Sequence, residues 1–80
     1  MNIKENIKTF LYDQKYFISY FENNIYVFNY LDLLKFKTTE IILKMDDFNL
    51  LINGKNLKIT KMENKELIIK GDIVSIGVEK

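Results

Sequence analysis

The chain contains no cysteine and no histidine, and each absence excludes a class of chemistry. Without cysteine it can form neither a disulfide framework nor a thiolate metal site. Without histidine, and with serine only at Ser19 and Ser75, it cannot assemble a Ser/His/Asp or Cys/His nucleophile system. The adjacent carboxylates Asp46 and Asp47 fit a solvated turn better than a catalytic pair, because neighbouring side chains of a strand point to opposite faces. We therefore predict a protein that is not an enzyme and has no cofactor and no metal site.

Arginine is also absent, and the formal net charge is only +1 with acidic and basic residues interspersed. This charge pattern creates no strong field for a polyanion such as nucleic acid. No apolar run approaches the ~20 residues of a membrane-spanning helix. Lys4, Glu5 and Lys8 interrupt the first residues, so no signal-peptide segment is expected. We predict a cytoplasmic protein that binds neither nucleic acid nor a small-molecule substrate.

Proline is missing as well, so the predicted turns rely on asparagine, aspartate and glycine. From residue 16 onward the apolar residues recur with a period of two, which is typical of β-strands. The predicted strands cover residues 16–21, 25–30, 33–36, 40–45, 49–53, 56–61, 66–70 and 73–78. Before them, apolar residues at helical spacing predict a short N-terminal helix or arm within residues 1–15.

A repeated pattern dominates the second half of the chain. Residues 50–59 and 67–76 are each an apolar segment interrupted by one glycine, and an offset of 17 residues carries Gly54 onto Gly71. Glycine at such a junction supplies a turn or a bulge, where positive φ or close backbone approach is needed. We predict that both glycines are structural turn residues that touch no ligand.

The predicted fold is all-β, a single domain over residues 1–80, with the strands in residues 16–80. Several strands are apolar on both faces, which favours a curled meander of about seven short strands, barrel-like or sandwich-like. Tight turns place neighbours in sequence next to each other in the sheet. A short β-solenoid is the alternative, because the 17-residue repeat could be one rung. The predicted core consists of Leu50, Ile52, Leu57, Ile59, Leu67, Ile69, Ile73 and Ile76.

Aromatic residues alternate on one predicted strand at Tyr26, Phe28 and Tyr30. If exposed, this stripe would serve as a patch for docking another protein. Two other interpretations stay open. The rings could cover the β core, or they could stack on single-stranded nucleic acid beside the nearby lysines.

The chain resembles the YabP/YqfC family of sporulation proteins, and the likeness is closer to YqfC. The matching segments are residues 25–30, 33–36, 40–42, 50–59 and 66–76. They include an I-x-G-x-x-L-x-I block and, near the end, an I-x-G-x-I-x-x-I block. The first block is filled by Ile52, Gly54, Leu57 and Ile59, and the second by Ile69, Gly71, Ile73 and Ile76.

The resemblance implies a non-catalytic sporulation protein that acts as a binding or assembly module during endospore formation. It also implies a membrane protein as partner, and so a cytoplasmic protein that can sit peripherally at a membrane of the sporulating cell. Two alternatives are a self-assembling structural β module, hence a homo-oligomer, and a single-stranded nucleic-acid binder.

Overall fold

The computed structural model describes residues 16–80, and in this range all regular structure is β. Six antiparallel strands form one open sheet in the order β1-β2-β6-β5-β4-β3. The strands are β1 (Phe17–Phe21), β2 (Asn24–Phe28), β3 (Asp32–Lys37), β4 (Glu40–Lys44), β5 (Asn49–Glu63) and β6 (Glu66–Glu79). The all-β prediction is confirmed. The predicted N-terminal helix lies outside the described residues.

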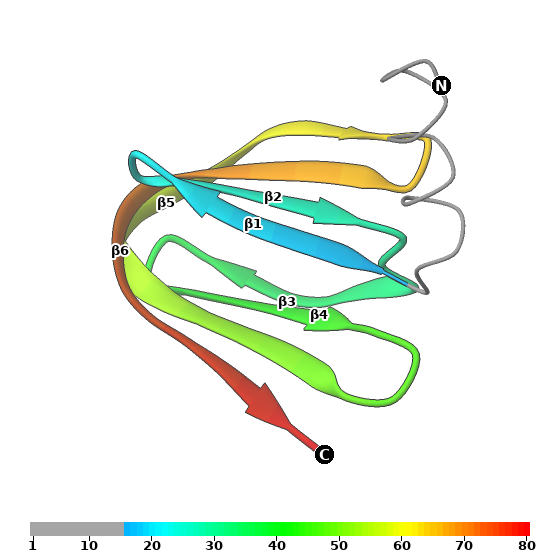
Figure 1. Ribbon diagram of the computed structural model, residues 1–80. Helices are drawn as coiled ribbons and strands as arrows, with labels where there is room; N and C mark the ends of the chain where they lie inside the picture. Colours follow the sequence, from blue (N-terminus) through cyan, green and yellow to red (C-terminus); the bar gives the residue numbers. More distant parts are fainter. Residues whose placement is uncertain (1–15) are drawn as a thin grey trace.

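The two longest strands, β5 and β6, bend in their middle, and this bend folds the sheet into two facing layers (Figure 1). One layer contains β1, β2 and the first half of β6, where Ile25 lies opposite Ile69. The other layer contains β3, β4 and the first half of β5, where Ile41 lies opposite Ile52. Each long strand therefore carries one hairpin on its first half, and the sheet is curled as predicted.

Gly54 and Gly71 lie at the bend, where β5 and β6 approach most closely. A Cβ atom on Gly54 would overlap the carbonyl oxygen of Asp72, and one on Gly71 would lie 2.8 Å from the carbonyl oxygen of Asn56. Gly71 also has a φ of 147°, which side-chain-bearing residues rarely adopt. The pairing register shifts next to Gly54, as it does at a β-bulge.

The glycines bend the chain without reversing it, and this changes the strand count. The segments predicted on either side of Gly54 form the single strand β5, and those around Gly71 form β6. The sheet therefore has six strands in place of about seven. A period-two pattern interrupted by glycine does not by itself distinguish a bulge from a reverse turn.

Two hairpin turns meet the same bend through backbone hydrogen bonds. The Gly71 N–H donates to the Asn23 carbonyl in the β1–β2 turn at 3.2 Å. On the other side, the β3–β4 turn supplies two acceptors. The Gly54 N–H donates to the Thr39 carbonyl at 3.1 Å, and the Leu57 N–H donates to the Thr38 carbonyl at 2.8 Å. The bend thus fixes the position of both hairpins.

The predicted adjacency of consecutive strands is wrong at one connection. β2 and β3 lie in different layers, so the chain between them crosses the molecule. Asn29, at a φ of 66°, donates its N–H to the Lys65 carbonyl at 2.8 Å, and the Leu31 N–H donates to the Lys44 carbonyl at 2.7 Å. These bonds tie the crossing to both layers. The antiparallel pairing of all described strands excludes the β-solenoid, whose rungs pair in parallel.

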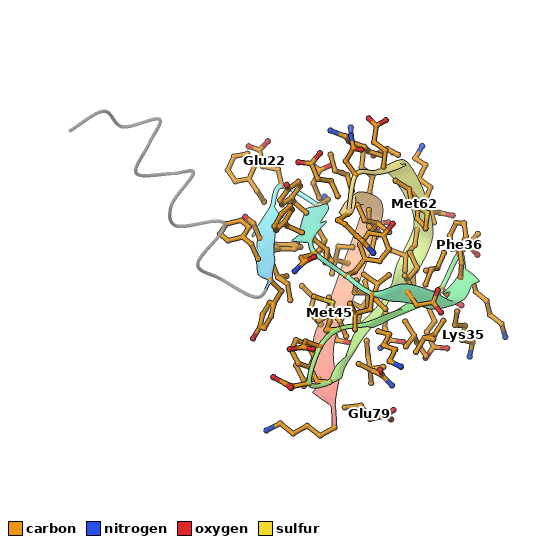
Figure 2. All side chains as sticks on the ribbon, turned by 90° about the vertical axis from the view of Figure 1, so that its right-hand side faces the viewer. Glu22, Lys35, Phe36, Met45, Met62 and Glu79 are labelled. Carbon is orange, nitrogen blue, oxygen red and sulfur yellow. The ribbon has the colours of Figure 1, made fainter. Side chains whose placement is uncertain are left out.

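The core fills the space between the two layers, as the position of Met45 in Figure 2 illustrates. Phe36 and Met62, in contrast, lie at the border of the molecule, 50% and 49% exposed. The buried hydrophobic residues are Ile25, Val27, Tyr30, Ile41, Leu43, Met45, Leu50, Ile52, Leu57, Leu67 and Ile69. This confirms five of the predicted core residues, namely Leu50, Ile52, Leu57, Leu67 and Ile69.

The other three predicted core residues differ in their burial. Ile59 and Ile73 are partly buried and pack against the core. Ile76 is 41% exposed, so its assignment to the core is wrong. It lies opposite the buried Ile52 and on the same face, but in a part of β6 where the described residues supply a neighbouring strand on one side only.

Truncation of the core should be costly. We expect Ile69→Ala to lower the free energy of unfolding by ~2–5 kcal/mol, because Ile69 is fully buried and its loss leaves a cavity. Ile59→Ala, directly across the strand pair, should cost less because Ile59 is only partly buried. Urea unfolding followed by circular dichroism measures both. Equal costs at the two positions would contradict the placement of Ile69 in the centre of the core.

Substitution of the bend glycines should be costly too, and Gly77 provides a matched control in β6. Gly71→Ala should lower the free energy of unfolding by ~1–3 kcal/mol through backbone strain and overlap with Asn56. A Cβ on Gly77 meets nothing within 4 Å, so Gly77→Ala should change stability by less than ~1 kcal/mol in either direction. If the two variants show the same thermal unfolding, the close approach of the two backbones does not stabilise the bend.

Candidate protein-interaction surfaces

The three aromatic residues predicted as partner anchors do not share one face. Ile25 and Val27 of β2 point into the core, so Tyr26 and Phe28 lie on the outer face of the sheet. Tyr30 follows Asn29, which has a φ of 66°, and this conformation breaks the alternation. The Tyr30 side chain joins the core with 9% exposure. A docking surface on this face can therefore use Tyr26 and Phe28 and cannot use Tyr30.

On the outer face, Tyr26 and Phe28 belong to what we call the outer aromatic patch, formed by Phe17, Tyr26, Phe28 and Ile68. Phe17 lies opposite Phe28, and Ile68 lies opposite Tyr26 in the neighbouring strands. The Phe17 and Tyr26 rings meet edge to face, with centroids 6.2 Å apart and planes at 61°. All four residues are half-buried, because they cover one another on the sheet.

A polar network adjoins this patch. The Tyr26 hydroxyl donates to Glu66 Oε1 at 2.7 Å, and Lys61 Nζ lies 3.0 Å from Glu66 Oε2. Both carboxylate oxygens of Glu66 are therefore engaged. This network was not predictable from the sequence, because Tyr26 and Glu66 are 40 residues apart and no local pattern connects them.

The pKa values of these residues reflect their contacts. Burial raises the pKa of Tyr26 to about 12, and the hydrogen bond to Glu66 adds to this effect. Hydrogen bonds from Tyr26 and then from Lys61 lower the pKa of Glu66. The hydrogen bond to Glu66 and its charge raise the pKa of Lys61. The neutral phenol, the carboxylate and the ammonium group stabilise one another, so the network fits a structural role.

The lysines near the outer aromatic patch bear on the nucleic-acid hypothesis. Lys61 lies opposite Ile68, which on its other side lies opposite Tyr26, but the Lys61 ammonium group is paired with Glu66. Glu63 lies opposite Glu66 in the neighbouring strand. Two carboxylates beside the aromatic rings reduce attraction to phosphates, which supply most nonspecific nucleic-acid affinity. Nothing in this arrangement favours the nucleic-acid hypothesis over protein contact.

A second candidate surface is the part of β6 that we call the free half of β6, residues 71–79. β2 pairs with β6 only as far as Lys70, so among the strands that the structure describes the free half is paired with β5 alone. Three of its side chains are largely exposed, Val74 at 70%, Ile76 at 41% and Val78 at 58%. This surface was not predicted from the sequence, because Ile76 was expected in the core. A signal was nevertheless present, because residues 73–78 combine high β propensity with no charge.

Gly54 lies outside both surfaces, and Gly71 is the first residue of the free half of β6. Both lie at the bend against the backbone of the facing strand, as described above. Within residues 16–80, no cluster of three or more Asp or Glu side chains could hold a metal ion. No helix in that range is long and apolar enough to cross a membrane.

Comparison with known proteins gives one match. A model of the YabP family matches residues 21–79, which covers β2 to β6 and both bend glycines. The match does not distinguish YabP from YqfC, so the closer likeness to YqfC stays a prediction. No curated protein and no solved structure matches the chain.

The Glu66 network should make stability depend on pH on the acid side. The folded protein holds the pKa of Glu66 below its ordinary value of 4.5, so this contribution is present above pH 4.5 and is lost as the pH falls further. We expect wild type to lose more stability than Glu66→Gln between pH 5 and pH 3 in urea unfolding. If wild type and Glu66→Gln lose the same stability between pH 5 and pH 3, the network does not favour the charged carboxylate.

Proposed function

The chain belongs to the YabP family, and from this membership we propose that it is a non-catalytic sporulation protein that acts as a binding or assembly module. YabP family membership is consistent with a sporulation-related role, and the family is not a known enzyme family. The family match over residues 21–79 is the observation that carries this proposal.

The described surface supports a role in binding more than in chemistry. The polar groups beside the outer aromatic patch are engaged in structural contacts, because Glu66 accepts a hydrogen bond from Tyr26 and pairs with Lys61. The exposed apolar residues of the described surface gather on the edges of the sheet and beside the outer aromatic patch, where Phe21 is 67% exposed. Exposed apolar groups of this kind mark contact sites for proteins.

For the partner, we propose a membrane protein of the sporulating cell, which would hold this chain peripherally on the cytoplasmic side. The outer aromatic patch is the proposed contact, with Tyr26 and Phe28 as anchors, because aromatic residues dominate the energetics of protein interfaces. Tyr30, predicted as a third anchor, is left out because it is buried.

Deletion of the gene in its native host tests the role. We expect vegetative growth to be normal and the yield of heat-resistant spores to fall, because the proposed module is needed only during spore formation. Complementation with the wild-type gene should restore the yield. Normal yields of heat-resistant spores from the deletion strain would contradict the sporulation role.

Complementation with variants tests the contact surface. Phe28→Ser removes an anchor of the outer aromatic patch, and we expect it to restore few heat-resistant spores. Phe36→Ser is the matched control, since Phe36 is 50% exposed on β3 in the other layer. Both purified variants must unfold at the same temperature as wild type. Equal complementation by the two variants would remove the outer aromatic patch from the proposal.

A further inference from the structure

In the part of the chain that the structure describes, the free half of β6 is an unpaired sheet edge. The order of the sheet places β6 between β2 and β5, but β2 ends opposite Lys70. Among the described residues, no strand lies beyond residues 71–79, which form the lower border of the molecule in Figure 1. On such an edge, every second residue directs its N–H and C=O away from the sheet, ready to pair with another strand.

This edge has less protection against pairing than the edge of β3. β3 carries Lys35 and Lys37, and the register of its pairing with β4 shifts between Leu33 and Lys35. Both features hinder the addition of a strand to β3. In the free half of β6, residues 75–79 pair regularly with β5, and a register shift lies at Val74, between the pairs Asn53–Ser75 and Gly54–Ile73. The exposed side chains there are apolar, with Val74, Ile76 and Val78 all more than 40% exposed. An unprotected edge with exposed valine and isoleucine side chains favours a strand as its ligand.

We propose that the free half of β6 pairs antiparallel with the free half of β6 in a second copy of this chain, about a two-fold axis at Ile76. With the axis at this residue, Ile76 lies opposite the partner's Ile76, and Val74 lies opposite the partner's Val78. Asp72 then lies opposite the partner's Lys80, so opposite charges meet at both ends of the paired segment. A two-fold interface requires this kind of self-complementarity.

Other registers lose this complementarity. With the axis moved to Ser75, Asp72 lies opposite the partner's Val78, and a charge faces an apolar side chain. With the axis moved to Gly77, Val74 lies opposite the partner's Lys80. Of these three registers, only the one centred on Ile76 places Val74 opposite the partner's Val78 and Asp72 opposite the partner's Lys80, and cross-strand pairs of like polarity and of opposite charge stabilise a sheet.

Such a dimer explains why Ile76 and Val78 are exposed in a single chain. Both lie opposite buried residues of β5, Ile52 and Leu50, and so on the inner face of their layer. The dimer would continue this layer into the second copy, as a sheet running from β3 of one copy to β3 of the other. Its formation is independent of the proposed role in sporulation and can be tested on the purified protein.

The absence of cysteine makes cross-linking a direct test of the register. Directly opposite residues of an antiparallel pair have Cα atoms ~4.5–5.5 Å apart, within the range of a disulfide. Under mild oxidation, we therefore expect Ile76→Cys to form a covalent dimer. Val74→Cys and Val78→Cys should each stay largely monomeric on a non-reducing gel, whereas a mixture of the two should cross-link. Cross-linking of Val74→Cys alone, with none for Ile76→Cys, would overturn the register.

Sedimentation velocity over a range of concentrations tests the dimer itself. We expect wild type to dimerise and Ile76→Lys to stay monomeric, because two ammonium groups would meet at the axis. Phe36→Lys, a charge added on the edge of β3, is the control and should dimerise like wild type. Asp72→Lys and Lys80→Asp should each weaken the dimer by about two- to tenfold, and the double variant should recover wild-type affinity.

Three results would overturn the proposal. Wild type could be monomeric at all concentrations, which would include the case in which residues 1–15 cover the edge. It could form a dimer that Ile76→Lys leaves intact, which would place the interface elsewhere. Finally, the double charge variant could fail to recover affinity while Ile76→Lys disrupts the dimer, which would keep the edge but reject the antiparallel register. None of these results bears on the yield of heat-resistant spores from the deletion strain, so the two proposals fail separately.

Discussion

At the bend of β5 and β6, two backbones lie closer together than a side chain would permit, and the rest of the fold depends on this approach. Gly54 lies against Asp72, and Gly71 lies against Asn56 and Leu57. Because the strands bend there together, the first half of β5 comes to face the first half of β6. Each half then carries one hairpin, and the apolar faces of the two layers bury each other.

The same bend accounts for the surfaces that stay open. β2 reaches Lys70 and stops, because its turn is held at Gly71 by the bond from the Gly71 N–H to the Asn23 carbonyl. The chain of β6 continues beyond this point for another nine residues, and within residues 16–80 β5 is its only neighbouring strand there, so an edge remains. A bent hairpin that builds the core therefore also produces an unpaired strand edge, and an edge of this kind must be covered, protected or used for pairing.

How much of this was predictable depends on the range of each interaction. The period-two pattern and the repeated glycines are local, so they predicted the all-β class and the core positions of Leu50, Ile52, Leu57, Leu67 and Ile69. Burial at Ile76 was not predictable, because it depends on where β2 ends, a contact between segments more than 40 residues apart in the chain. The burial of Tyr30 has a local cause, the positive φ of Asn29. An asparagine at the end of a strand can adopt this conformation but does not require it, so the sequence alone did not predict the burial.

The repeat found in the sequence has a structural basis that bears on function. The 17-residue offset relates the first half of β5 to the first half of β6, and each half pairs with its hairpin in an equivalent register, since Ile41 pairs with Ile52 as Ile25 pairs with Ile69. The two layers are thus similar in construction but differ in their edges. The layer of β1 and β2 presents aromatic rings, and the layer of β3 and β4 adjoins the free half of β6. Two unlike surfaces on one small domain would allow a protein to bind a partner through one and a second copy of itself through the other, which is the arrangement an assembly module needs.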